Sequence, residues 1–176
     1  MTVKYYDWVE YQSNFRPKKI AIKEISSGRE TSYYELNQRS KSLAGWLQKK
    51  GLKKGDRVAA YVPNKIESII SFLACAKNGI IWSSCSPDFG TQGVLDRFKQ
   101  IEPSILITSD HYFYNGKKIN ILEKIKNILK QIPSIKKTLV FAYNKKENVN
   151  LQNYINFDHV LEKEKMDETF ERFEFN

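Results

Sequence analysis

The apolar positions of the first 33 residues predict a short helix followed by a β-hairpin. Between residues 5 and 15 the aromatic and aliphatic side chains recur close to helical spacing. Residues 19–25 read Lys-Ile-Ala-Ile-Lys-Glu-Ile, which suits a strand, residues 26–29 read Ser-Ser-Gly-Arg, which suits a turn, and residues 30–33 are again suited to a strand. We therefore expect a helix, a strand, a turn and a return strand at the start of the chain.

From residue 34 onward the pattern changes to helices that alternate with short, buried strands. Such alternation with short turns is typical of a parallel sheet with helices on its faces. The sequence therefore predicts an α/β fold, a partial doubly wound parallel sheet with flanking helices, preceded by the N-terminal helix and hairpin. The predicted strands are 57–62, 80–83, 104–108 and 137–141, and the predicted helices are 36–50, 66–76, 94–101 and 119–132.

The length of 176 residues suits one domain or part of one. We divide residues 1–176 into the helix and hairpin at 1–33, the α/β sheet region at 34–142, and a final part at 143–176. That final part reads as a polar loop, a charged helix at 157–165 and the start of an incomplete strand at 170–176. Sheets of this class bind ligands beyond the carboxyl ends of their strands, so the loops after Val62, Trp82, Thr108 and Phe141 are the ones to inspect.

The amino-acid composition indicates which class of protein to expect. Hydrophobic residues make up 41% and charged residues 28%, as in a soluble globular protein. No apolar run approaches the roughly 18 residues of a membrane span, and the N-terminus lacks a signal-peptide pattern, so we expect a cytoplasmic protein and no membrane partner. In a reducing compartment Cys75 and Cys85 are expected to be free thiols, and no cluster of Cys and His indicates a metal site.

The net charge of +9 raises the question of nucleic-acid binding. The excess lysines are scattered among Asn and Ile, while residues 157–176 are acidic, and no RNA- or DNA-binding motif accompanies them. We therefore do not expect nucleic acid as a partner. A non-catalytic α/β module that binds an acidic partner through its basic surface remains the alternative function.

Phosphate-binding and nucleophile motifs are missing from the 176 residues. The sequence contains no GxxxxGK(S/T), GxGxxG, GxSxG or HExxH pattern, and His111 and His159 are isolated. We assign no catalytic residue and expect no tight nucleotide binding by this chain alone.

Two segments at strand ends are candidates for ligand binding. Residues 82–90 pass from a strand into a helix with small hydroxyl residues, a Pro and a Gly, which suits an anionic or carbonyl ligand at a helix N-terminus. A simple capped turn is the alternative. Residues 108–118 combine three aromatic rings with a Gly-Lys-Lys turn, which suits an adenine and phosphates. Here the alternative is a solvated basic turn.

The same segments resemble a known family. Residues 82–90, which read WSSCSPDFG, and residues 94–103, which read VLDRFKQIEP, closely resemble a stretch of the acetoacetyl-CoA synthetases (acetoacetate–CoA ligases). Residues 55–59 and 62–64, GDRVA and VPN, are similar to the broader AMP-forming acyl-CoA synthetase pattern of the adenylate-forming superfamily, and residues 112–117, YFYNGK, match the segment that follows. The resemblance runs from about residue 20 to residue 141.

The resemblance implies an acid–thiol ligase of lipid metabolism. Members join a carboxylate to CoA in two steps, because ATP first forms an acyl-adenylate and the CoA thiol then displaces AMP. The resemblance implies ATP with Mg²⁺ and CoA as the ligands of the full-length enzyme, and acetoacetate or another short carboxylate as its substrate. By the same resemblance, one wall of the CoA site would be formed by Ser84, Asp88, Phe89, Gly90, Tyr114 and Lys117.

The sequence also departs from the family. Tyr114 stands where the related acetyl-CoA synthetases carry a basic residue. The family's phosphate loop, its adenine-binding motif and its catalytic Lys have no counterpart in the 176 residues. We therefore expect the N-terminal fragment of such a ligase, inactive alone. An open sheet edge is expected to favour self-association.

Overall fold

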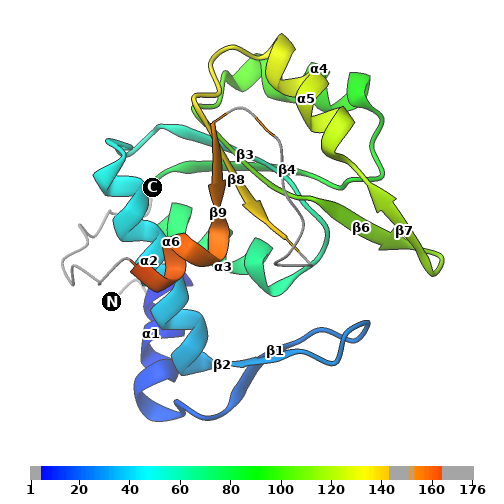
Figure 1. The fold of residues 1–176 in the computed structure, drawn as a ribbon. Helices are drawn as coiled ribbons and strands as arrows, with labels where there is room; N and C mark the ends of the chain where they lie inside the picture. The colour runs from blue at the N-terminus through cyan, green and yellow to red at the C-terminus, as the bar shows by residue number, and fades with distance from the viewer. Residues whose placement is uncertain (1–4, 143–150, 152, 164–176) are drawn as a thin grey trace.

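The computed structural model describes residues 5–142, 151 and 153–163. The chain starts with α1 (Tyr5–Phe15), followed by an antiparallel hairpin of β1 (Ile20–Lys23) and β2 (Glu30–Ser32). This confirms the predicted helix and hairpin. The hairpin extends away from the sheet at the lower right of Figure 1.

The first helix of the α/β part is α2 (Tyr33–Lys49), and its start follows from a capping box. The Ser32 hydroxyl accepts a hydrogen bond from the Glu35 backbone N–H at 3.2 Å, and the Glu35 carboxylate accepts one from the Ser32 N–H at 2.8 Å. These bonds to Ser32 lower the pKa of Glu35. Two backbone donors that a helix start leaves without partners are thereby satisfied.

A parallel five-stranded sheet forms the centre of the fold, in the order β4-β3-β5-β8-β9. Helices cover both of its faces (Figure 1). The strands are β3 (Arg57–Tyr61), β4 (Ile81–Cys85), β5 (Ile105–Ser109), β8 (Lys137–Phe141) and β9 (Tyr154–Asn156). The helices that follow α2 are α3 (Ile66–Lys77), α4 (Thr91–Ile101), α5 (Leu122–Gln131) and α6 (Phe157–Lys163).

Alternate side chains of β3 enter two separate cores. Val58 and Ala60 pack with α1, α2, α3 and α6, whereas Ala59 and Tyr61 pack with α4 and α5. Because both faces of the strand are buried, its sequence is apolar without alternation, as expected for a parallel sheet. The predicted doubly wound α/β architecture is confirmed. The strand order reverses between β3 and β5, and the carboxyl ends of these strands are where such sheets bind ligands.

The structure differs from the sequence prediction in one candidate segment. Residues 108–118, predicted as a loop, contain β6 (His111–Tyr114) and form a hairpin with β7 (Lys117–Asn120). Asn115 and Gly116 connect the two strands with φ angles of 48° and 72°. Two consecutive positive φ angles are what a tight hairpin turn needs, and Asn-Gly is the sequence pair that adopts them most readily. Because β7 occupies residues 117–120, α5 starts at Leu122 and not at residue 119.

One further strand boundary was placed wrongly, and one strand was missed. The second sheet strand continues through Ser84 and Cys85, because these residues pair with Ala60 and Tyr61 of β3. β9 was not predicted, since a strand of three residues is too short to give a recognisable pattern. The charged helix predicted at 157–165 is present as α6. The predicted loop at 143–148 and strand at 170–176 lie outside the described residues.

Candidate functional site

A short turn at the carboxyl end of β4 carries three of the residues expected to contact a ligand, Asp88, Phe89 and Gly90. The Ser86 hydroxyl donates a hydrogen bond to the Asp88 carboxylate at 3.0 Å, and the Phe89 N–H donates to the Ser86 carbonyl at 3.1 Å. Gly90 then caps α4 without a side-chain hydrogen bond. The first N–H groups of α4 are consequently left for solvent or a ligand.

Tyr61 supports this turn from inside the protein. Its hydroxyl lies 2.8 Å from both the Pro87 and the Phe89 carbonyl oxygens, so its single proton is shared between two acceptors. Tyr61 is fully buried, and this burial raises the pKa of its hydroxyl to about 12. The phenol therefore stays protonated and donates to the turn at every physiological pH.

The side chain of Phe89 is held on the outside of the turn. The Arg97 guanidinium carbon on α4 lies 4.9 Å from the centre of the Phe89 ring, a cation–π distance. A Phe89 ring carbon also lies 3.5 Å from where a Cβ would stand at Gly93, an ordinary van der Waals distance, so the ring packs against the first turn of α4. The ring nevertheless remains 40% exposed, which leaves part of its surface for a ligand.

The β6–β7 hairpin joins the turn through Tyr112. Tyr112 is buried, and burial together with the nearby Asp88 carboxylate raises the pKa of its hydroxyl. Further along the hairpin, Tyr114 and Lys117 are directly opposite each other in the register. Both are exposed beside the Asn115–Gly116 turn. The hairpin thus holds a ring and an ammonium group side by side.

Ser84 lies apart from these groups. It is an exposed residue of β4, and it lines a hollow of about 220 Å³ beside α3 together with Phe72 and Trp82. In the part of the chain that the structure describes, no contact links Ser84 to Tyr114 or Lys117. Five of the six predicted site residues therefore lie on the turn and the hairpin, and the sixth lines a different hollow.

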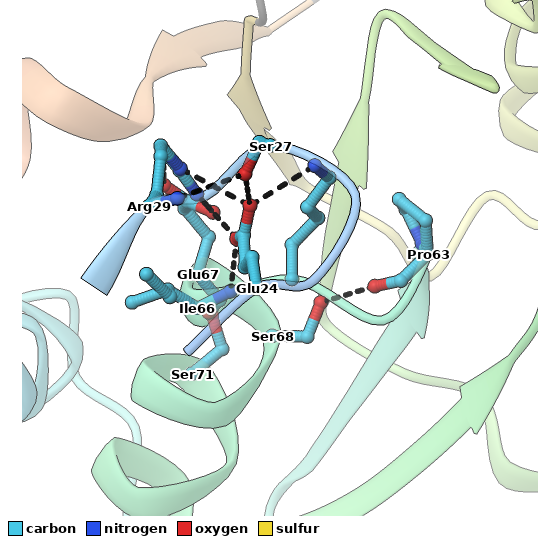
Figure 2. Close-up of polar contacts among 9 residues, drawn as sticks. Glu24, Ser27, Arg29, Pro63, Ile66, Glu67, Ser68 and Ser71 are labelled. Carbon is cyan, nitrogen blue, oxygen red and sulfur yellow. Dashed lines mark hydrogen bonds and ion pairs between the residues drawn. The ribbon is translucent and has the colours of Figure 1, made fainter. Parts of the chain in front are cut away.

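A second hollow, of about 380 Å³, lies at the carboxyl end of β8, on the face of the sheet that α2, α3 and α6 cover. Both acidic and basic side chains line it, namely Arg29, Arg39, Lys65, Glu67 and Asp158, together with Ser27, Phe141 and Ala142. Figure 2 shows the ionic cluster beneath it, in which Glu24 and Arg29 of the β1–β2 hairpin meet the start of α3.

Glu24 is the centre of this cluster. Its carboxylate accepts hydrogen bonds from the Ile66 backbone N–H at 2.9 Å, the Lys65 ammonium at 3.1 Å and the Arg29 guanidinium at 2.6 Å. Burial raises the pKa of Glu24, but hydrogen bonds from Arg29, Ser27, Ile66 and Lys65 outweigh it and lower the pKa to about 2. Lys65, the N-cap residue of α3, makes no capping hydrogen bond with its side chain. Glu24, which lies 42 residues before Ile66 in the sequence, accepts the first helix N–H instead.

Arg29 joins Glu24 to a second buried carboxylate. Its guanidinium donates to the two oxygens of Glu67 at 2.9 and 2.7 Å, in the bidentate geometry typical of strong arginine–carboxylate pairs. These bonds raise the pKa of Arg29. The cluster pairs two acids with two bases, so it fastens the hairpin to α3 and carries no excess charge for an anionic ligand.

The remaining expectations from the sequence concern thiols, metals and membranes. Cys75 and Cys85 are buried free thiols, and burial raises the pKa of each. Among the described residues there is no group of three or more His, Cys, Asp or Glu side chains placed to hold a metal ion. The helices in the same residues are too short or too polar to cross a membrane.

Sequence reasoning missed Tyr61, Arg97 and Tyr112 as supports of the site. Arg97 and Tyr112 lie inside the segments that resemble the ligase family, but their partners are on other elements. Tyr61 was read only as part of a buried strand. A buried tyrosine at the last position of a strand was the available signal, because its hydroxyl needs a hydrogen-bond partner in the following loops.

Replacing Tyr61 by Phe should loosen the turn that carries Asp88 and Phe89. The variant lacks the buried hydroxyl that donates to the Pro87 and Phe89 carbonyl oxygens. We therefore expect the free energy of unfolding to fall by about 1–3 kcal/mol. Amide exchange at Ser86, Asp88, Phe89 and Gly90 should also become faster. Tyr114→Phe, which removes an exposed hydroxyl, is the control and should leave both quantities unchanged. Equal exchange in the two variants would show that Tyr61 does not support the turn.

Comparison with known proteins places this arrangement in a family. Residues 9–169 match the family described as "AMP-binding enzyme". The chain is 41% identical over 143 residues to an acetoacetyl-CoA synthetase of Gallus gallus, a match that covers 78% of this chain and 21% of that protein. It is 49% identical over 98 residues to an acetoacetyl-coenzyme A synthetase of Rhizobium meliloti (strain 1021), covering 56% of this chain and 15% of that protein.

A solved structure agrees with the sequence matches. The acetoacetyl-CoA synthetase from Streptomyces lividans superimposes with a TM-score of 0.87 and 28% sequence identity, over 97% of this chain and 26% of that one. The chain thus spans about a fifth of the length of the curated relatives and about a quarter of this structure.

Proposed function

The chain belongs to the AMP-binding enzyme family, and we propose that it forms the N-terminal portion of an acid–thiol ligase that makes acetoacetyl-CoA or another short acyl-CoA. The main support is the similarity to acetoacetyl-CoA synthetases, with 41% identity over 143 residues to one of them and a superposition on another over 97% of this chain. In this proposal residues 1–176 are the first part of the large adenylation domain. Its subdivisions are the helix and hairpin at 1–33, the sheet region at 34–142 and the remainder at 143–176.

The overall reaction consumes a carboxylate, ATP and CoA and releases AMP and pyrophosphate. In the first step a carboxylate oxygen attacks the α-phosphorus of ATP and pyrophosphate leaves. In the second the CoA sulfur attacks the acyl carbon, the thiol proton is lost and AMP leaves. The 176 residues contain no phosphate-binding loop, so ATP and Mg²⁺ would be held by other parts of a full-length ligase. This chain would contribute the sheet and one wall of the CoA site, in the cytoplasm.

The turn and the hairpin have the chemistry that a CoA nucleotide needs. Lys117 offers an exposed ammonium group for a phosphate, and the partly exposed Phe89 ring offers a flat surface for the adenine. Gly90 leaves the start of α4 open to an anionic group. Tyr114, beside Lys117, supplies a second ring in place of a second positive charge.

Asp88 and Ser84 have less direct roles in this proposal. The Asp88 carboxylate already accepts a hydrogen bond from Ser86 and lies near Tyr112, so in this proposal it orients the turn and does not approach a phosphate. Ser84 is a residue of β4, and it is connected to the turn by the backbone that follows it. We therefore propose Phe89, Gly90, Tyr114 and Lys117 as the CoA contacts, with Asp88 and Ser84 as residues of the supporting wall.

A chimera tests this function. Residues 1–176 would replace the corresponding quarter of the Streptomyces lividans synthetase, and we expect the chimera to form acetoacetyl-CoA. Lys117→Ala in the chimera should raise the KM for CoA about tenfold, as expected for the loss of one charge-assisted hydrogen bond. Acetoacetate-dependent ATP–pyrophosphate exchange, which needs no CoA, should be unchanged.

Two controls accompany the chimera. Lys118→Ala changes the next residue, whose side chain points to the opposite face of the hairpin, and should leave the KM for CoA unchanged. The 176-residue chain alone should show no pyrophosphate exchange. Exchange by the chain alone, or a folded chimera that makes no acyl-CoA, would contradict the proposed function.

A further inference from the structure

The β6–β7 hairpin leaves the parallel sheet through a single residue, Asp110. β5 ends at Ser109 and β6 begins at His111, and within the described residues the two strands of the hairpin pair only with each other. In Figure 1 the hairpin extends beyond the sheet as a separate ribbon. An isolated two-stranded hairpin is marginally stable at best in water, so contacts other than strand pairing must fix its orientation.

Asp110 holds both ends of this hairpin. Its carboxylate Oδ1 accepts a hydrogen bond from the His111 backbone N–H at 3.0 Å, at the start of β6. Its backbone carbonyl accepts a hydrogen bond from the Ile121 N–H at 3.2 Å, directly after β7. The entry and the exit of the hairpin are therefore both bonded to one residue, which stands at the end of a central sheet strand.

The other carboxylate oxygen of Asp110 lies against the His111 ring. Oδ2 is 3.0 Å from the His111 Nδ1, which is an ion-pair distance when the imidazole is protonated. The side chain of Asp110 is 0% exposed and that of His111 is 3% exposed. Burying such polar groups costs free energy unless they are partnered, and partnered buried groups favour a single arrangement of the chain. Both side chains are covered by this chain alone, so their burial needs no further segment.

The His111 ring lies on the face of the hairpin opposite to Tyr114 and Lys117. Alternate residues of a strand share a face, so His111 is on the same face as Phe113, and their rings meet edge to face at 5.3 Å. Tyr114 is on the other face, and Lys117, which is directly opposite it in the register, shares that face. The base of the hairpin is thus held from one face, while the other presents a ring and an ammonium group.

We propose that Asp110 and His111 are positioning residues, which fix the angle between the β6–β7 hairpin and the sheet and thereby place Lys117 for a phosphate of CoA. Tyr114 and Lys117 lie about 10 Å along the strands from the base of the hairpin, at about 3.4 Å per residue. A rotation of about 15° at the base would therefore move them by roughly 2–3 Å, enough to break a hydrogen bond of about 2.9 Å. The role in CoA binding rests on the proposed function, whereas the anchoring of the hairpin does not.

A double-mutant cycle in the Streptomyces lividans chimera tests this role. Asp110→Ala removes the acceptor of the His111 N–H and the partner of its ring, and it should raise the KM for CoA about tenfold, as Lys117→Ala does. The double variant should also show a rise of about tenfold and not about 100-fold, because both changes remove the same contact with CoA. Acetoacetate-dependent ATP–pyrophosphate exchange should be unchanged in all three. Glu123→Ala, which changes an exposed carboxylate on α5, is the control and should alter neither quantity.

Asp110→Asn keeps an oxygen acceptor for the His111 N–H, so its KM for CoA should lie between those of wild type and Asp110→Ala. The same cycle can be run with this milder variant if Asp110→Ala does not fold. Additive effects in the cycle, or a loss of pyrophosphate exchange equal to the loss of CoA binding, would show a general structural role and overturn the proposal.

A measurement on the 176-residue chain tests the anchoring without the ligase function. Asp110→Ala should speed amide exchange in β6 and β7 about tenfold, the effect of losing one hydrogen bond, and leave exchange in β3 and β5 at the wild-type rate. If Lys117→Ala leaves the KM for CoA unchanged, the proposed CoA contact fails, and the exchange rates alone then decide the anchoring. Unchanged exchange in the hairpin of Asp110→Ala would overturn it.

Discussion

The variant Glu24→Ala is expected to lose about 3–5 kcal/mol of the free energy of unfolding, the size reported for removing one member of a buried ion pair. The substitution leaves Lys65 and part of Arg29 without their carboxylate partner, and it removes the acceptor for the first N–H of α3. Chemical denaturation followed by far-UV circular dichroism measures the change. Glu30→Ala is the matched control, because Glu30 forms an exposed ion pair with Lys23 on the same hairpin and should matter far less.

The pH dependence of stability offers an independent check on Glu24. Its pKa is lowered to about 2 in the folded protein from 4.5, so its contribution is complete above pH 4.5 and is lost as pH falls toward 2. A shift of this size corresponds to about 3 kcal/mol. Glu24→Gln should remove this part of the acid dependence. If wild type and Glu24→Gln lose stability in parallel between pH 5 and pH 2 (roughly the span of the titration), the carboxylate does not have the role described.

The variant Phe157→Ala is expected to cost about 3–5 kcal/mol, the typical range for removing a buried aromatic ring. Phe157 is fully buried at the start of α6, and its ring meets that of Phe141 on β8 at 5.8 Å. The measurement tests whether the segment after the undescribed residues 143–150 belongs to the same cooperative unit as the sheet. Thermal unfolding should remain a single transition at a lower temperature.

The control for this variant is His159→Ala, which changes an exposed residue of the same helix. Its free energy of unfolding should stay within about 0.5 kcal/mol of wild type. A small effect of Phe157→Ala would mean that α6 docks weakly and that the sheet is stable without it.

The sheet strands and most helices were predictable because each has a strong local pattern. The buried runs at 57–62 and 104–108 and the amphipathic spacing of 36–50 depend only on neighbouring residues. The β6–β7 hairpin was also predictable in principle, since Asn115–Gly116 is a strong hairpin signal between alternating residues. It was missed because the aromatic and basic residues around it were interpreted as ligand chemistry. The three-residue β9 had no such signal.

The supports of the candidate site could not be derived from local patterns. Tyr61 meets Pro87 and Phe89 across 26 and 28 residues, and Arg29 meets Glu67 across 38. Nothing in the composition of either segment specifies its partner. Segment 82–90 was correctly placed at the edge of the sheet where ligands bind, but the division between strand and turn at Cys85 depends on pairing with β3. The resemblance to a family identified the segment, and only the fold shows how it is supported.

The capping of α3 by Glu24 has a consequence for cooperativity. A helix whose first N–H depends on a residue 42 positions earlier is not expected to fray on its own, because opening its first turn also breaks the bonds to the hairpin. The β1–β2 hairpin and the start of α3 should therefore open as one sub-global unit, with a common free energy of amide exchange. Through Lys65 and Glu67 that unit borders the 380 Å³ hollow at the carboxyl edge. Local fluctuations of the N-terminal hairpin would then be transmitted directly to the rim of the sheet where ligands of this fold are bound.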